Sequence, residues 1–125
     1  MERIRRNKEL ENQIRPSNKS GSHVNCFRYF PNNTDKHEDI KYQLYKRLIR
    51  VGFKVWTEAI FNSGKRADIV AIRNGRGYVI EVETPKSPKI SKEILEQKSK
   101  IYPDQFDVIV VNTNKYNPED YIGIE

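Results

Sequence analysis

The feature that most constrains this fold is an apolar hairpin pattern centred on Asn74 and Gly75. Mostly apolar residues fill positions 67–72 and 78–82 on either side of these two turn residues. Asn-Gly strongly favours a two-residue type I′ turn, because both turn positions need positive φ angles. Apolar residues occupy both alternating faces of the two strands, which is typical of a sheet covered on both sides. The segment therefore predicts a buried antiparallel hairpin.

Acidic residues face each other across this hairpin. A turn at Asn74-Gly75 places Asp68 opposite Glu81, and Glu83 lies on the same face as Glu81 because side chains alternate along a strand. Like charges directly opposed across a sheet are destabilising unless a cation neutralises them. Carboxylate oxygens suit Mg²⁺ or Mn²⁺. The residues alone leave two alternatives open: a solvated acidic face, or a shifted register in which Asp68 opposes Glu83 or the patch dissolves.

Composition limits the partners. The chain has 125 residues and a net charge of +6, so we expect one small domain and a polyanion such as nucleic acid as a plausible partner. No apolar run reaches the length of a membrane span or forms a signal-peptide core, and Cys26 alone forms no internal disulfide. We therefore expect a cytoplasmic protein without a membrane partner.

Residues 1–34 are predicted to form a basic arm, partly flexible or involved in dimerisation, ahead of a domain over residues 35–125. A short helix over residues 2–14 and a strand or docking loop over residues 26–30 fit within the arm. Its cations either bind phosphates or belong to a solvated tail. The predicted phosphate-binding residues of the arm are Arg3, Arg5, Arg6 and Lys8.

The rest of the chain predicts an α/β fold. A helix begins at a cap on Thr34 or Asp35 and ends at Gly52, a strand follows over residues 53–58, and the hairpin described above comes after a turn at residues 62–65. A second helix runs from residue 87 or 91 to 102, with Ile94, Gln97 and Ile101 on one face. A central strand covers residues 106–111, and residues 121–124 add an edge strand. The predicted order is α-β-β-β-α-β around a mixed central sheet flanked by helices.

This order, with Asp68 on the second strand and Glu81-Val82-Glu83 on the third, resembles the PD-(D/E)XK nuclease superfamily. The similarity spans residues 35–112, and it is closest in pattern to archaeal Holliday-junction resolvases and related small repair or restriction-like nucleases. It implies a restriction-endonuclease-like core and a metal-dependent endonuclease that cleaves phosphodiester bonds in DNA, branched DNA included. It also implies Mg²⁺ or Mn²⁺ as the cofactor and a homodimer, since two strands must be cut.

The same resemblance implies roles for individual residues. Asp68, Glu81 and the backbone carbonyl of Val82 would hold the metal, and Glu83 would accept a hydrogen bond from the attacking water. Glu83 stands where the usual motif has lysine, so another cation must meet the charge of the phosphate. The candidates for that cation are Lys65, Arg66, Lys86 and Lys89.

Two further residues carry both a functional and a structural interpretation. Glu38 either assists metal binding or stabilises its helix N-terminus. Gln97 either contacts the site or substrate or makes a structural hydrogen bond. Glu58 is expected to be exposed. A zinc site from His23, Cys26 and His37 is disfavoured, because structural zinc needs four closely spaced ligands.

Two other functions fit the sequence. The chief alternative is a catalytically degenerate nuclease-fold module that binds nucleic acid or a protein partner without cleavage, since the motif lysine is missing. The other is a structural interaction domain with a coincidental acidic face.

Overall fold

The structure is a computed structural model that describes residues 2–19, 23–84 and 88–117, without the side chains of residues 88–91. Its elements in chain order are α1 (Glu2–Glu11), the 3-10 helix η1 (Pro16–Lys19), α2 (Asp35–Arg50), β1 (Lys54–Ile60), β2 (Arg66–Arg73), β3 (Arg76–Glu83), α3 (Pro88–Ile101) and β4 (Phe106–Asn112). From α2 onward this is the predicted order of helices and strands. The chain is an α/β protein, as the sequence pattern indicated.

Four strands form one mixed sheet in the order β1-β2-β3-β4. The first three are antiparallel neighbours, and β4 pairs with β3 in parallel after the crossover through α3. Arg73 pairs with Arg76, and Asn74 and Gly75 have φ angles of 54° and 77°. The predicted two-residue turn is therefore confirmed, and the register centred on Gly75-Arg76 is wrong.

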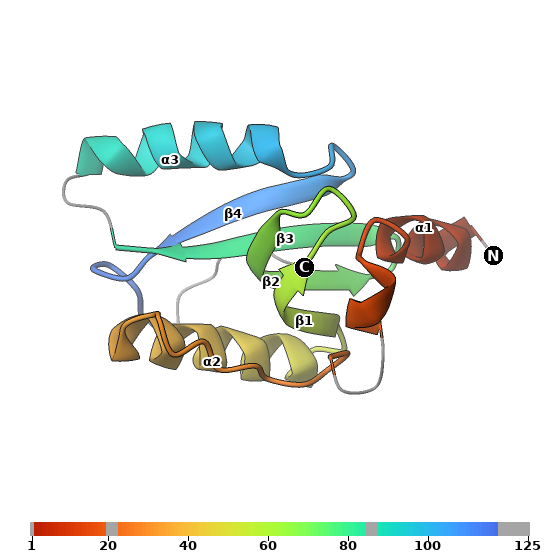
Figure 1. Ribbon diagram of the computed structural model, residues 1–125, viewed down its shortest axis with the longest axis horizontal. Helices are drawn as coiled ribbons and strands as arrows, with labels where there is room; N and C mark the ends of the chain where they lie inside the picture. Colours follow the sequence, from red (N-terminus) through yellow and green to blue (C-terminus); the bar gives the residue numbers. More distant parts are fainter. Residues whose placement is uncertain (1, 20–22, 85–87, 118–125) are drawn as a thin grey trace.

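Helices cover the two faces of the sheet, with α2 on one side and α3 on the other (Figure 1). On the α2 side, Leu44 and Leu48 pack against strand residues that include Ile69 and Ile80. On the opposite side Val70 belongs to a second buried cluster. The other main members of that cluster are Leu10, Ile14, Trp56, Val79, Tyr102 and Phe106. The prediction of strands buried on both faces is confirmed.

Both ends of α2 follow from local sequence. The Thr34 hydroxyl accepts a hydrogen bond from the His37 N–H at 3.2 Å, so Thr34 is the N-cap rather than Asp35. Gly52 has a φ angle of 92°, a left-handed conformation that glycine adopts without strain, and the helix ends just before it. The helix therefore starts at a fixed point, which places His37 and Glu38 in its first turn.

The N-terminal residues pack on the sheet. Leu10 and Ile14 are buried, whereas Ile4 is exposed, and the Asn7 side chain accepts a hydrogen bond from the Gly75 N–H at 2.7 Å. Residues 26–30 form a loop rather than a strand. Its Phe27 ring contacts the rings of Tyr42 and Tyr45. The helical part of the arm thus rests beside the hairpin turn, and the division into arm and domain stays a prediction.

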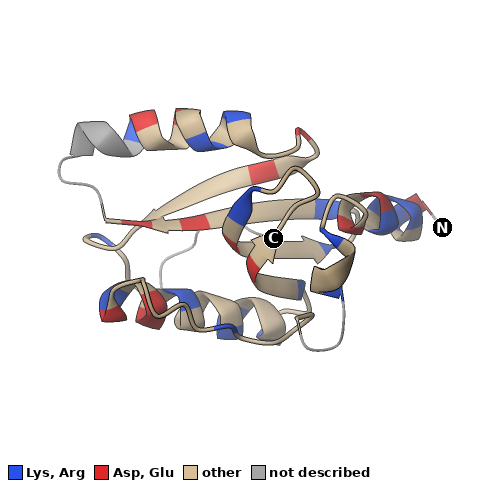
Figure 2. Cartoon of the chain, in the orientation of Figure 1, with Lys and Arg blue, Asp and Glu red and all other residues tan. Residues whose placement is uncertain are grey.

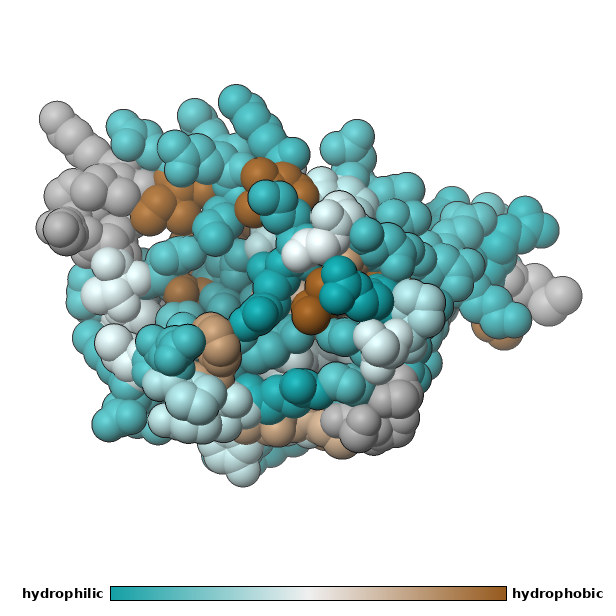
Figure 3. Space-filling view, in the orientation of Figure 1, coloured by the Kyte–Doolittle hydropathy of each residue, from teal (hydrophilic) through white to brown (hydrophobic). Residues whose placement is uncertain are grey.

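The orientation of α3 differs from the predicted one. Ile101 is 39% exposed and Gln97 is also exposed, while Lys98 is partly buried and Tyr102 just beyond the helix is buried. The helix therefore turns Lys98 and Tyr102 inward, and the predicted face was wrong for Gln97 and Ile101. Figure 3 shows a mostly hydrophilic face with apolar patches in the region of α3. The predicted edge strand over residues 121–124 lies outside the described residues.

None of the helices in the described ranges is long and apolar enough to cross a membrane.

Candidate active site

The sheet opens between β2 and β3 at the paired acids. Backbone pairing runs from Arg73–Arg76 to Ile69–Ile80, so the next rung brings Asp68 opposite Glu81, as predicted. At this pair, backbone N–H groups donate to carboxylate side chains of the neighbouring strand instead of to its backbone carbonyls. The Asp68 N–H donates to Glu81 Oε2 at 3.0 Å, and the Val82 N–H donates to Asp68 Oδ2 at 2.8 Å. Each carboxylate is therefore fixed by the backbone of the neighbouring strand.

Glu58 adds a third acid from β1. The pairs Thr57–Ile69 and Ala59–Ala67 place Glu58 opposite Asp68, where it has a φ angle of 50°. This left-handed backbone turns the carboxylate toward α2, so the prediction of an exposed Glu58 was wrong. The local sequence does not predict this conformation, because the residue is not a glycine.

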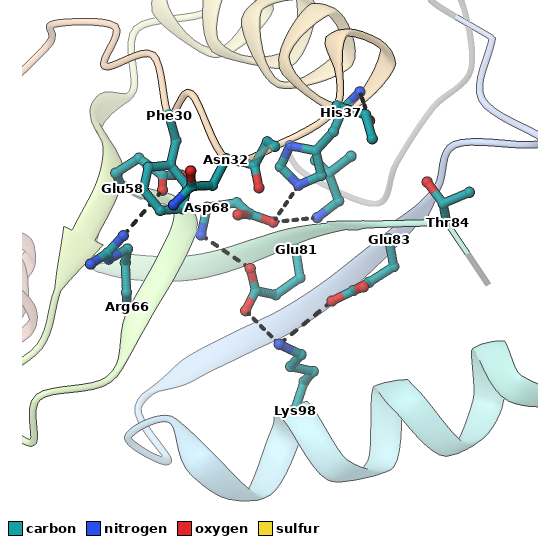
Figure 4. A pocket seen from close by; sticks show the side chains of 13 residues that line it. Phe30, Asn32, His37, Glu58, Arg66, Asp68, Glu81, Glu83, Thr84 and Lys98 are labelled. Atoms are coloured by element: carbon teal, nitrogen blue, oxygen red, sulfur yellow. Dashed lines mark hydrogen bonds and ion pairs between the residues drawn. The ribbon is translucent and has the colours of Figure 1, made fainter.

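The acids line a cavity of about 370 Å³ between the sheet, α3 and the loop before α2 (Figure 4). The lining residues are Phe30, Asn32, Asn33, Thr34, His37, Glu58, Arg66, Asp68, Glu81, Val82, Glu83, Thr84 and Lys98. Figure 2 shows the acidic residues of β3 in the half of the strand away from α1. The cavity thus gathers four carboxylates with two cations and one histidine.

The two central carboxylates differ in protonation. Burial and the neighbouring Asp68 charge raise the pKa of Glu81 to about 7. Burial also opposes ionisation of Asp68, but hydrogen bonds from His37, Glu81 and the Val82 N–H hold the pKa of Asp68 below its ordinary value. The pair therefore shares a proton near neutral pH, and a bound cation would relieve the same repulsion.

His37 joins the centre to the first turn of α2. Its Nε2 lies 3.3 Å from Asp68 Oδ2, and its Nδ1 lies 3.3 Å from Glu38 Oε2. Burial of the ring opposes protonation, yet the hydrogen bonds and charges of these two acids raise the pKa of His37. His23 instead contacts Arg28, so the histidines do not come together as a zinc site would require.

Lys98 of α3 is a cation of the site that the sequence interpretation missed. Its Nζ lies 3.4 Å from Glu81 Oε1 and 3.5 Å from Glu83 Oε1. Its partial burial opposes the charge, but the two glutamates raise the pKa of Lys98. The spacing of four residues between Lys98 and Tyr102 was the available signal, because both then lie on one face of the helix.

Tyr102 closes the buried side of the site. Its hydroxyl donates to Glu81 Oε1 and is also 3.0 Å from the Arg66 carbonyl. Burial and the Glu81 charge raise the pKa of Tyr102. The neutral phenol therefore orients one oxygen of Glu81.

A buried ion network supports the cavity wall. Lys41 is fully buried, and its Nζ lies 2.8 Å from Glu38 Oε2 and 3.2 Å from Glu58 Oε2. Glu38 also accepts hydrogen bonds from the Phe30 N–H and the Asn33 amide. Glu38 itself does not line the cavity, and its oxygens are engaged by Lys41 and by Phe30 and Asn33 of the cavity wall, while His37 connects it to Asp68.

The remaining predicted residues are distributed as follows. Glu83, Val82 and Arg66 line the cavity, while Lys65 and Gln97 are exposed and do not. Lys86 and the side chain of Lys89 lie outside the described residues. The arm cations Arg3, Arg5, Arg6 and Lys8 are exposed on α1, beside the hairpin turn at the other end of β3 (Figure 2).

Without divalent ions, the folded chain is expected to be more stable at pH 5 than at pH 8. Folding raises the pKa of Glu81 from 4.5 to about 7, so the folded state holds a proton that the unfolded state releases in this window. Stability therefore falls as pH rises through it, by roughly 3 kcal/mol. The raised pKa values of His37 and Glu58 act in the same direction. Urea unfolding in EDTA at both pH values measures the difference.

The isosteric variant Glu81→Gln is the control for this pH dependence. Its side chain stays neutral at every pH, so most of the slope should disappear. A wild-type chain as stable at pH 8 as at pH 5 would contradict the shared proton.

Comparison of the sequence with protein-family models gives no match, and neither do comparisons with curated proteins and with solved structures.

Proposed function

We propose that the chain is a metal-dependent endonuclease of the PD-(D/E)XK type, with a restriction-endonuclease-like core, that hydrolyses phosphodiester bonds in DNA. The observation that carries the proposal is the pair Asp68 and Glu81, which lie opposite each other on adjacent strands at an open cavity, each held by a backbone N–H of the neighbouring strand. Purely structural acids rarely meet in this way, because the repulsion costs stability. DNA and a second copy of the chain are the proposed partners.

The donor set fits a hard divalent cation such as Mg²⁺ or Mn²⁺. Asp68 and Glu81 would hold it, with the Val82 carbonyl as a further oxygen ligand. No group of three His, Cys, Asp or Glu side chains in the described ranges forms a ready metal site, so substrate and solvent oxygens would complete the shell. When bound, the ion would polarise the phosphate and lower the pKa of a nearby water.

Lys98 supplies the positive charge that the motif lacks at Glu83. Its Nζ reaches both Glu81 and Glu83, a position from which it can bind an oxygen of the scissile phosphate. Glu83 accepts a proton from the attacking water, whose oxygen forms the new bond to phosphorus as the bond to the leaving oxygen breaks. Arg66, with its guanidinium 4.8 Å from the Phe30 ring centroid, stands on the opposite wall as a second phosphate ligand.

Replacing Lys98 with methionine is expected to reduce kcat about 10²- to 10³-fold, because it removes one fixed hydrogen-bond donor to the transition state. Methionine keeps the length of the side chain, so the helix packing should survive. Single-turnover cleavage measures the effect. Lys100→Met is the matched control, because Lys100 is exposed on the same helix. A loss below tenfold in Lys98→Met would remove Lys98 from the reaction.

The proposed function is tested by incubating the protein with labelled duplex DNA, single-stranded DNA, RNA and a four-way junction in Mg²⁺, Mn²⁺ or EDTA. We expect internal cuts that require the metal, with the junction distinguishing a resolvase-like enzyme from a general nuclease. The pairing of Lys98 with Glu83 favours one other function, a degenerate nuclease-fold module, because it neutralises the available cation. Binding without cleavage in either metal would establish that alternative.

A further inference from the structure

A second cavity, of about 360 Å³, lies along one flank of α2, beside Tyr116. Its lining residues are Gln43, Lys46, Arg47, Arg50 and Tyr116. Gln43 is three residues before Lys46 and four before Arg47, and Arg50 is four residues after Lys46 and three after Arg47, so the four residues share one side of the helix. The lining holds three cations and no acid, which makes the cavity a site for an anion rather than for an apolar ligand.

Three of the lining side chains, Lys46, Arg50 and Gln43, are the candidates for contact with a ligand. No salt bridge within the described ranges involves Lys46 or Arg50, and the Lys46 Nζ lies 4.5 Å from the Tyr42 ring centroid. The buried Gln43 Oε1 has no hydrogen-bond partner in the described part of the chain. An amide can turn to present either its oxygen or its NH₂ group, so Gln43 can donate to an anion.

We propose that this cavity binds backbone phosphates of a nucleic-acid strand that continues from the catalytic cavity along α2; the inference rests on the proposed function for the identity of its ligand. The first turn of α2 borders the catalytic cavity through Thr34 and His37. The helix rise places Gln43 about 9 Å and Arg50 about 20 Å from His37 along its axis. The interval from Gln43 to Arg50 is about 10 Å, the rise of three nucleotides of one strand.

Both cavities therefore border α2, the first at its N-terminal turn and the second along its later turns, and Figure 2 shows basic residues along this helix. The basic residues of α1 lie at the hairpin end of the sheet and would contact a different part of the substrate. The two proposed contacts with the nucleic-acid backbone therefore lie on different helices, and only the contact on α1 was predicted from sequence.

The double variant Lys46→Gln/Arg50→Gln tests the inference in EDTA, where binding is measured without cleavage. Affinity for a labelled 20-base-pair duplex is measured at several NaCl concentrations. Each phosphate contact contributes about 0.9 to the slope of log affinity against log salt, so the variant should lose about 1.8 from the wild-type slope. Lys92→Gln/Lys100→Gln removes the same charge from the exposed side of α3 and should keep the wild-type slope.

Competition with inorganic phosphate distinguishes the sources of the anion. A backbone site should release the duplex only at phosphate concentrations that act through ionic strength, whereas displacement at low millimolar phosphate would show a free-phosphate site and overturn the proposal. An unchanged slope in Lys46→Gln/Arg50→Gln, an equal loss in the control, or no duplex binding by the wild-type protein would also overturn it. A reduced slope in a protein that never cleaves would uphold the phosphate cavity and refute the nuclease proposal instead.

Discussion

Replacing Asp68 with asparagine is expected to lower metal-dependent cleavage at least about 10³-fold, equivalent to roughly 4 kcal/mol of transition-state stabilisation. The substitution removes one of the two charges proposed to hold the metal. It preserves the shape of the side chain, and an amide oxygen can still accept the Val82 N–H bond that the carboxylate accepts at 2.8 Å. The fold should therefore remain, and above neutral pH stability should rise slightly because Glu81 loses its repelling neighbour.

Asp107→Asn is the matched control for this variant. Asp107 is exposed on β4, and the same chemical change there should leave cleavage within about twofold of wild type. Cleavage is compared under single-turnover conditions with the substrate that the wild-type protein cuts fastest. Residual activity above one tenth in Asp68→Asn would show that the acids on β2 and β3 are not the catalytic centre.

The second large effect concerns stability. Replacing Lys41 with methionine is expected to cost about 3–5 kcal/mol, because it leaves Glu38 and Glu58 beside each other without their shared cation. The Lys41 ammonium also donates to the Arg28 carbonyl at 2.9 Å. This is a large part of the total stability, because the free energy of unfolding of a small domain is about 5–15 kcal/mol. Urea unfolding at pH 7 measures the change.

Lys36→Met, on the exposed side of the same helix, should change stability by less than about 0.5 kcal/mol. Adding Glu38→Gln and Glu58→Gln to Lys41→Met removes the uncompensated charges and should restore part of the loss. If Lys41→Met is as stable as Lys36→Met, the buried network does not support the cavity wall. Because the network binds both Arg28 and Phe30 of the preceding loop, cleavage should fall together with stability.

The hairpin shows why part of the site could be predicted from sequence. Two adjacent residues with positive φ angles fixed the turn, and the turn fixed every pair up to Ile69 and Ile80. Since side chains alternate, the register also placed Asp68 opposite Glu81 and kept both faces of the strands apolar. The ends of α2 were readable for a similar reason, because a capping threonine and a left-handed glycine act locally.

Of the two cations that line the cavity, Arg66 was among the candidates predicted from sequence, but Lys98 could not be predicted in this way. In α3, Ile94, Leu95 and Ile101 are apolar at positions that fit two different helix faces, and only packing on β4 selects the one that carries Lys98 inward. The position of Glu58 depends on a left-handed backbone that no glycine announces. Lys41 resembles any exposed helix lysine until the tertiary fold buries it between two carboxylates.

The measurement that tests the central claim most directly is calorimetric titration of the wild-type chain and Asp68→Asn with Mn²⁺, without nucleic acid. We predict that the wild-type chain binds Mn²⁺ and, near pH 6.5, releases a proton on binding, because the ion replaces the proton on Glu81. Asp68→Asn should lose this binding, and Asp107→Asn should keep it. Equal binding by wild type and Asp68→Asn, or no binding by wild type, would contradict a metal centre at Asp68 and Glu81.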